Sequence, residues 1–172
     1  MSLFARLFQS GPDPREEWRA LWHGIVAEAR DPDWYRMCGV ADTVEGRYDM
    51  ITLVLALVML RLEDAPELSN PATARLTELF VEDMEGQLRE AGIGDPTVGK
   101  KITALMESMN GRIGAYREGL AGDRRLLVEA VRRNVTMAQP DEAEALVSQA
   151  CALHERLART SADGLRAGEI AA

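Results

Sequence analysis

Apolar and polar residues along this chain follow the spacing of α-helices. The clearest case lies between residues 98 and 120, where apolar side chains recur every three or four positions, the period of a helix. This stripe consists of Val98, Ile102, Leu105, Met109, Ile113, Tyr116 and Leu120. No segment alternates between apolar and polar residues over the length of a strand. The pattern therefore predicts an all-α fold.

Pairs of Asp or Asn followed by Pro mark where several helices begin. Such a pair supplies an N-cap and a proline at the first helical position. The pairs are Asp13-Pro14, Asp31-Pro32, Asn70-Pro71 and Asp95-Pro96. Asp42 with Glu45 resembles a capping box, and Asp123 is a further N-cap candidate. The expected helices span about 14–30, 32–39, 43–62, 71–92, 96–120, 123–135 and 140–159. This predicts a single-domain bundle of about six to eight helices with short connections.

Three parts of the chain differ in character. Residues 1–12 form a short amphipathic segment, residues 13–160 carry the helical domain, and residues 161–172 read as a polar tail. Within the first part, one turn of helix would gather Leu3, Phe4, Leu7 and Phe8 on one side. Such a segment either docks on the domain or lies at a membrane interface.

The most apolar stretch is Met50–Leu60, which is bounded by Asp49 and Arg61. As a helix it would be about 17 Å long, whereas the hydrocarbon core of a bilayer is about 30 Å thick. It is therefore too short to span a membrane. A helix that is apolar on all sides is either buried in a core or faces an apolar partner.

Composition and charge narrow the classes of partner. The 172 residues are 47% hydrophobic and 28% charged, with a net charge of -8, which is typical of a folded domain and disfavours binding to DNA. Residues 61–95 have nine acids and three arginines, and residues 96–140 have eight basic residues and four acids. The basic segment is either a solvated face or a surface toward anionic lipid or a ribosome.

No residue pattern indicates catalysis, a cofactor or a metal. His23 and His154 stand alone, and the two cysteines have no metal-ligand spacing. The segment from Gly94 to Lys100 matches the start of a phosphate-binding loop, but Lys101 replaces the required Ser or Thr. The sequence therefore predicts a protein that is not an enzyme. The glycines here have structural explanations: a left-handed helix end at Gly92, a tight turn at Gly94 and a close helix approach at Gly99.

Three groups of residues resemble one family. The first comprises Ala29-Arg30, Pro32, Tyr35, Gly39-Val40, Asp42-Thr43, Glu45-Gly46-Arg47 and Asp49. The second comprises Phe80–Met84, Leu88-Arg89-Glu90, Gly92–Asp95, Val98–Lys101, Met106, Gly111-Arg112 and Ala115-Tyr116. Arg133-Asn134-Val135 forms a weaker third. Their order and spacing, over roughly residues 20–136, resemble the ubiquinol–cytochrome c chaperone family. Met109-Asn110 and Thr136 depart from it, because family members tend to have aromatics there.

The resemblance implies an all-α assembly factor for ubiquinol–cytochrome c reductase, respiratory complex III. In this family the client is newly made cytochrome b, and residues 13–160 would form the chaperone domain. The short chain without a transit peptide resembles a bacterial member. Its expected location is cytoplasmic, peripheral at the cytoplasmic face of the inner membrane.

The resemblance also directs attention to a set of candidate residues. An apolar groove for the client would be walled by Leu53, Leu57, Met106 and Met109, unless these residues are plain core. The expected client-binding residues are Asp83, Arg89, Gly92, Gly94, Asp95, Gly99 and Lys100, whose charges would otherwise serve in capping and ion pairing. Leu3, Phe4, Leu7 and Phe8 are the expected membrane contacts. The alternative function is a helical carrier with a small apolar ligand, a lipid or quinone, in a closed cavity.

Overall fold

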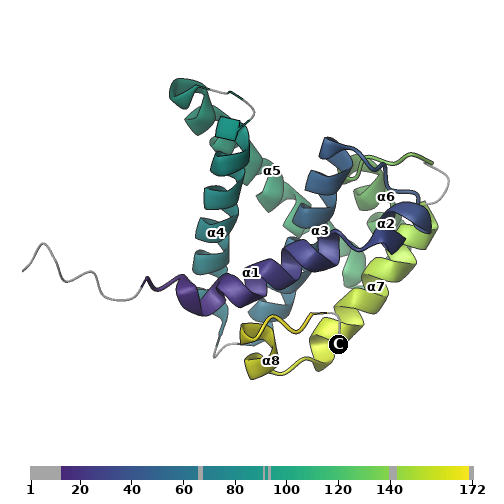
Figure 1. The fold of residues 1–172 in the computed structure, drawn as a ribbon. Helices are drawn as coiled ribbons and strands as arrows, with labels where there is room; N and C mark the ends of the chain where they lie inside the picture. Colours follow the sequence, from purple (N-terminus) through teal and green to yellow (C-terminus); the bar gives the residue numbers. More distant parts are fainter. Residues whose placement is uncertain (1–12, 66–67, 91, 93, 140–142, 171–172) are drawn as a thin grey trace, which may run out of the picture.

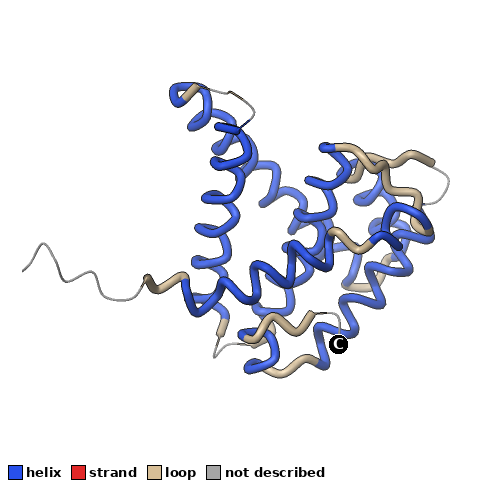
Figure 2. Tube along the Cα trace, in the orientation of Figure 1, coloured by secondary structure: helices blue, strands red, loops and turns tan. Residues whose placement is uncertain are grey.

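A computed structural model describes residues 13–65, 68–90, 92, 94–139 and 143–170 of the chain. They form a single helical domain, as the sequence predicts (Figures 1 and 2). The helices are α1 (Glu16–Ala29), α2 (Pro32–Arg36), α3 (Val44–Glu63), α4 (Ser69–Glu90), α5 (Asp95–Leu120), α6 (Arg124–Asn134), α7 (Ala143–Arg159) and α8 (Ala162–Arg166).

Helix α3 is the centre of the core. It packs against α1, α4, α5 and α7, and every residue from Asp49 to Leu60 is buried. This helix contains the apolar stretch Met50–Leu60, so burial on all sides explains why that stretch lacks a polar face. At its far end, the Arg61 guanidinium donates hydrogen bonds to the carbonyls of Leu157 and Thr160 at 2.9 and 3.1 Å. These bonds fix the end of α7 against α3.

The capping predictions are confirmed at α2 and α6 and wrong at α1, α3, α4 and α5. Helix α4 begins at Ser69, before Asn70, and α5 has Gly94 as its N-cap, with Asp95 as the first helical residue. The Asp31 and Asp123 carboxylates accept hydrogen bonds from the first turns of α2 and α6. At α3 the cap is the Thr43 hydroxyl, which accepts from the Gly46 N–H, while Asp42 forms an ion pair with Arg47. Asp13 lies before α1, where its carboxylate is taken up by Arg15. At α1 and α3 a nearby Arg competes for the carboxylate.

Helices α4 and α5 form a hairpin that projects from the body (Figure 1). Gly92 has φ +79°, which confirms a left-handed residue after α4. Gly99 does not allow a close helix approach as expected: it is exposed, and a Cβ there would meet nothing within 4 Å. The first turns of α5 are largely exposed apart from Val98, and the next fully buried side chain along the helix is Met109. The tip of the hairpin is therefore a surface feature.

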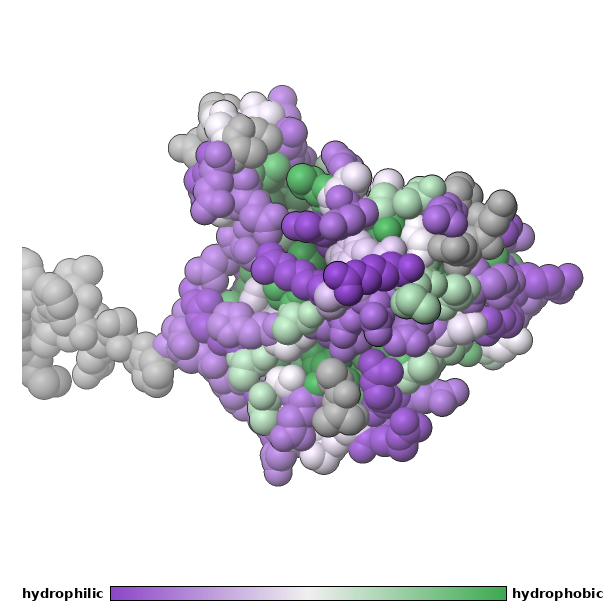
Figure 3. Space-filling model, turned by 45° about the vertical axis from the view of Figure 1, so that its right-hand side comes forward, coloured by the Kyte–Doolittle hydropathy of each residue, from purple (hydrophilic) through white to green (hydrophobic). Residues whose placement is uncertain are grey.

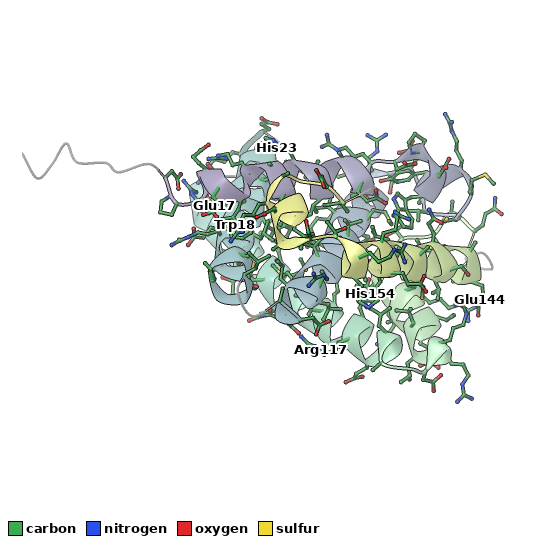
Figure 4. The ribbon with its side chains drawn as sticks, turned by 90° about the horizontal axis from the view of Figure 1, so that it is seen from below. Glu17, Trp18, His23, Arg117, Glu144 and His154 are labelled. Atoms are coloured by element: carbon green, nitrogen blue, oxygen red, sulfur yellow. The ribbon has the colours of Figure 1, made fainter. Side chains whose placement is uncertain are left out.

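Residues 161–170, expected as a polar tail, include α8 and fold back on α1. Leu165 and Ile170 are buried, and the Arg166 guanidinium lies 5.7 Å from the centre of the Trp18 ring. Gly168 has φ +82°, and a Cβ on it would lie 2.5 Å from the Ala20 carbonyl oxygen. This close approach requires glycine. Figure 4 shows Trp18 and Glu17 of α1 beside α8.

Candidate functional site

The described residues enclose a groove of about 1080 Å³ between the α4–α5 hairpin and the body of the protein. It is lined by Arg30, Val44, Glu45, Arg47, Tyr48, Asp49, Ile51, Met84, Gln87, Leu88, Lys101, Leu105, Arg112, Arg133, Asn134, Val135 and Thr136. Its walls thus come from the end of α1, the first half of α3, the facing sides of α4 and α5, and the end of α6. We call this feature the groove.

The floor of the groove is apolar. Ile51, Met84 and Val135 are buried beneath it, and Leu88 and Leu105 are half-buried on the hairpin side. Val44, on the lip, is 80% exposed, although a valine is ordinarily buried. The exposed lip shows that the groove is open to solvent. In Figure 3, hydrophobic residues (green) lie in the hollow at the base of the hairpin with hydrophilic residues (purple) around them.

A buried ion pair holds the wall of the groove together. The Arg112 Nη1 donates to the Asp49 carboxylate and to the Thr52 hydroxyl, each at 2.8 Å. The second oxygen of Asp49 accepts from the Thr136 N–H at 2.9 Å and from its hydroxyl at 2.8 Å. The side chains of Arg112 and Asp49 are only 12% and 9% exposed. One carboxylate therefore ties α3 to α5 and to the segment that follows α6.

The segment after α6 is also fixed by its backbone. The Ala41 N–H donates to the Thr136 carbonyl at 2.9 Å, and the Ala138 N–H donates to the Gly39 carbonyl at 2.8 Å. Val40 and Met137 form an isolated antiparallel bridge. Residues about 100 positions apart in the sequence are thus joined at one end of the groove.

Tyr48 forms part of the wall beside the ion pair. The Arg112 guanidinium lies 5.6 Å from the centre of its ring, and the Phe80 ring lies 6.5 Å away. Burial raises the pKa of the Tyr48 hydroxyl, against the opposing effect of the Arg112 charge. This hydroxyl has no hydrogen-bond partner among the described residues, so it is a neutral group that leaves one hydrogen-bonding capacity unused.

The groove has a positive charge on an acidic protein. Five cationic side chains line it against two carboxylates: Arg30, Arg47, Lys101, Arg112 and Arg133 against Glu45 and Asp49. Arg112 pairs with Asp49, and Arg47 pairs with Asp42 outside the lining at 2.7 Å. Within the described part of the chain, Arg30, Lys101 and Arg133 have no ion pair. The open side of the groove therefore presents uncompensated cations.

The expected groove walls lie elsewhere. Leu53 and Leu57 are 0% and 1% exposed, and Met109 is 2% exposed, so all three are core residues. Met106 is half-buried against the core and does not line the groove. The physical reason is that α3 is enclosed by its neighbours from Thr52 onward, so the groove reaches only its first two turns, from Val44 to Ile51.

The expected client-binding residues lie outside the groove lining. Gly92, Gly94, Gly99 and Lys100 are exposed at the tip of the hairpin, where Gly94 is the N-cap of α5. Arg89 pairs with Glu85 at 3.1 Å. Asp83 is half-buried near Trp22 and His23. The side chain of Asp95 and the predicted membrane contacts Leu3, Phe4, Leu7 and Phe8 lie outside the described residues.

The residues that carry the family resemblance nevertheless converge on the groove. Those that line it are Arg30, Glu45, Arg47, Asp49, Met84, Leu88, Lys101, Arg112, Arg133, Asn134 and Val135. They come from all three groups, including the weakest. Two charged residues give a signal that sequence reasoning missed. Asp49 borders the most apolar stretch, and Arg112 interrupts an apolar stripe. A charge in such a position requires a buried partner.

The groove contains no arrangement typical of catalysis. His23 and His154 lie on different helices, α1 and α7, in Figure 4, and neither lines the groove. Among the residues that the structure describes, no three His, Cys, Asp or Glu side chains could hold a metal ion together. What the groove offers chemically is an apolar floor with charged sides, which is suited to binding.

Comparison with known proteins agrees with the resemblance. The family model described as ubiquinol–cytochrome C chaperone matches residues 36–172. A solved structure, the Cbp3 homolog from Brucella abortus, is 32% identical in sequence, with a TM-score of 0.77 over 98% of this chain and 95% of that chain. A search of curated proteins gave no match. None of the described helices has the length and hydropathy that crossing a membrane requires.

Proposed function

This chain belongs to the ubiquinol–cytochrome c chaperone family, and from that premise we propose that it binds newly made cytochrome b in the groove during assembly of complex III. The observation that carries the proposal is the convergence of the family-resembling residues on one open groove with an apolar floor. A site that binds an apolar client needs such a floor, and it also needs polar sides that keep the free protein from associating with itself.

The physical task suits the groove. Newly made cytochrome b presents long apolar helices, and each Å² of apolar surface removed from water contributes roughly 25 cal/mol. The half-buried Leu88 and Leu105, with Val44 on the lip, offer accessible apolar surface of this kind. The client can also be released from the groove, because the side chains that contact it are already partly exposed in the free protein and no covalent bond to the client is formed.

A carrier of a small lipid or quinone fits the geometry less well. Such a ligand is usually buried over most of its surface in a cavity, whereas the lip of this groove includes the 80% exposed Val44. An open groove suits a segment of a larger protein, which keeps its other side outside the site. We therefore give preference to the protein client.

The proposed location is peripheral, at the cytoplasmic face of the inner membrane. Leu3, Phe4, Leu7 and Phe8 would supply apolar membrane contact. The basic segment 96–140 would add attraction to anionic lipid or to a ribosome. A vesicle flotation assay compares the full chain with a chain that lacks residues 1–9. Weaker flotation of the shortened chain supports the membrane contact, and equal flotation contradicts it.

The client proposal is tested by replacing the apolar hairpin side of the groove in cells. Leu88→Glu and Leu105→Glu together place charge on the floor, and Leu126→Glu, on an exposed part of α6 outside the groove, is the matched control. In a strain that depends on this protein for complex III, the double variant should lower the haem b spectrum and reductase activity of membranes. The control should restore both to wild-type levels. Full rescue by the double variant, at equal protein level, would overturn the proposal.

A further inference from the structure

We propose that the groove selects a helical segment whose apolar face is flanked by acidic side chains. The inference deepens the proposed function, because it states which chemistry the bound segment of the client must carry. It rests on the distribution of charge around the groove and on the length over which that charge extends.

The charge on the open side of the groove is not balanced. Two of the five lining cations, Arg112 and Arg47, are occupied by Asp49 and Asp42. The remaining cations are exposed and have no ion pair among the described residues: Arg30, Lys101 and Arg133. Among the acids that line the groove, Glu45 is likewise exposed and has no ion pair among the described residues. The rim therefore has a net positive charge available to a ligand, on a chain whose formal net charge is -8.

Elsewhere on the described surface, most arginines form ion pairs. Most of the other described arginines bind a carboxylate: Arg15, Arg19, Arg75, Arg117, Arg124 and Arg166 are examples. With 28 acids against 20 basic residues, carboxylates are abundant. Cations without a partner are thus the minority, and three of them surround one apolar floor. Charge complementarity of this kind favours an acidic ligand and disfavours a basic one.

The charged rim extends along about three turns of α5. Lys101 and Arg112 both line the groove from α5, and eleven residues of helix cover roughly 16 Å. Arg133 lies at the same end of the groove as Arg112. It is three residues before Thr136, and Thr136 donates hydrogen bonds to Asp49, the partner of Arg112. Cations at both ends of such a distance match carboxylates spread along about three turns of a helix. A single lipid headgroup cannot reach both ends, so the occupant is a protein segment.

The floor beneath the rim is apolar. Leu88 and Leu105 face the groove from the hairpin, and Ile51 and Val135 lie opposite on the body side. An amphipathic helix laid in such a groove buries one apolar face while its flanks stay near the rim. Acidic flanks would lie beside Lys101 and Arg133, whereas basic flanks would meet like charge.

The test uses synthetic helical peptides of about three turns that share one Leu/Phe face and differ only in their flanking residues, Glu or Lys. Binding to the full chain is followed by fluorescence anisotropy. The groove variant is Lys101→Glu with Arg133→Glu, and the milder Lys101→Gln with Arg133→Gln serves if the first does not fold. The control is Arg159→Glu, which reverses an exposed cation that has no ion pair in the described structure and is outside the groove.

We expect the Glu peptide to bind the wild-type chain at least about tenfold more tightly than the Lys peptide, with a preference that weakens as salt is added. The groove variant should lose about tenfold in affinity for the Glu peptide, and the control should stay within about twofold. Equal affinity for the two peptides, no binding of the Glu peptide, or an equal loss in the control would each overturn the inference.

Vesicles that contain phosphatidylglycerol provide the competing outcome. Two results together would show that the rim binds lipid and would overturn the inference. The vesicles would bind the wild-type chain but not the groove variant, and the Glu peptide would either be displaced only weakly by the vesicles or not bind at all. The proposed function is judged separately by the haem b spectrum in cells. Loss of the peptide preference with an intact requirement for Leu88 and Leu105 would reject only the acidic-flank inference.

Discussion

The two halves of α3 have contrasting surroundings. From Leu53 to Leu60 the helix is enclosed by its neighbours, and its side chains are 7% exposed or less. From Val44 to Ile51 it borders the groove, with Val44 80% exposed and Asp49 bound to Arg112. The more apolar half is the core, and the less apolar half lines the groove that we propose as the binding surface. Apolar character alone therefore does not distinguish a core helix from a candidate docking surface, and the exposed cations beside apolar side chains are the additional signal.

The largest expected effect is on the ion pair that holds the groove half together. Arg112→Met leaves the buried carboxylate of Asp49 without its countercharge, which should lower the free energy of unfolding by about 3–5 kcal/mol. Urea unfolding at neutral pH measures this value. A loss of less than about 1 kcal/mol would be typical of an exposed pair and would contradict the buried link between α3 and α5. Asp49→Leu combined with Arg112→Met should recover part of the loss, because no charge is then left unpaired.

The enclosed half of α3 should respond in stability and leave client binding unaffected. Leu57→Ala removes a fully buried side chain and should cost about 2–5 kcal/mol of unfolding free energy. Folded variant protein should still bind the client through the groove. Fluorescence anisotropy of the Glu peptide with folded variant protein tests the binding, and the midpoint of urea unfolding tests the stability. If Leu57→Ala abolished binding while the fold remained, the boundary between core and groove would be misplaced.

The smallest effect on stability is expected at the lip. Val44→Ser changes a side chain that is 80% exposed, so the unfolding free energy should stay within about 0.5 kcal/mol of wild type. Client capture should nevertheless decrease, because the apolar edge of the groove is lost. Capture per molecule is compared with that of Met37→Ser, a matched exposed apolar residue outside the groove. An equal decrease in both variants would remove the special role of Val44.

Local signals in the sequence were sufficient for the all-α class and for the helices from α1 to α7. Asp31, Asp123 and Gly92 mark helix ends through contacts within two or three residues, so their roles can be read from neighbours alone. Helix α8 escaped prediction because a five-residue helix with Leu165 as its buried apolar residue has too little periodicity to detect.

The groove could not be predicted in the same way. Its lining spans residues from Arg30 to Thr136, and those positions are brought together by tertiary contacts such as the Asp49–Arg112 pair. Leu53 and Leu57 were candidate walls because a helix that is apolar on all sides gives no indication of which side is covered. The resemblance includes many of the residues that line the groove, but the client-binding candidates chosen from it lie outside the lining. Only the packing of α4 and α5 against α3 shows which residues share a surface.

Site-specific photo-crosslinking in cells that assemble complex III tests most directly whether cytochrome b binds in the groove. A photoreactive residue is placed at Leu88 or Leu105 in the groove, and at Leu126 as an exposed control outside it. We expect newly made cytochrome b to be captured from positions 88 and 105 and not from position 126. Capture from 126 alone, equal capture from all three, or no cytochrome b at either groove position would contradict it.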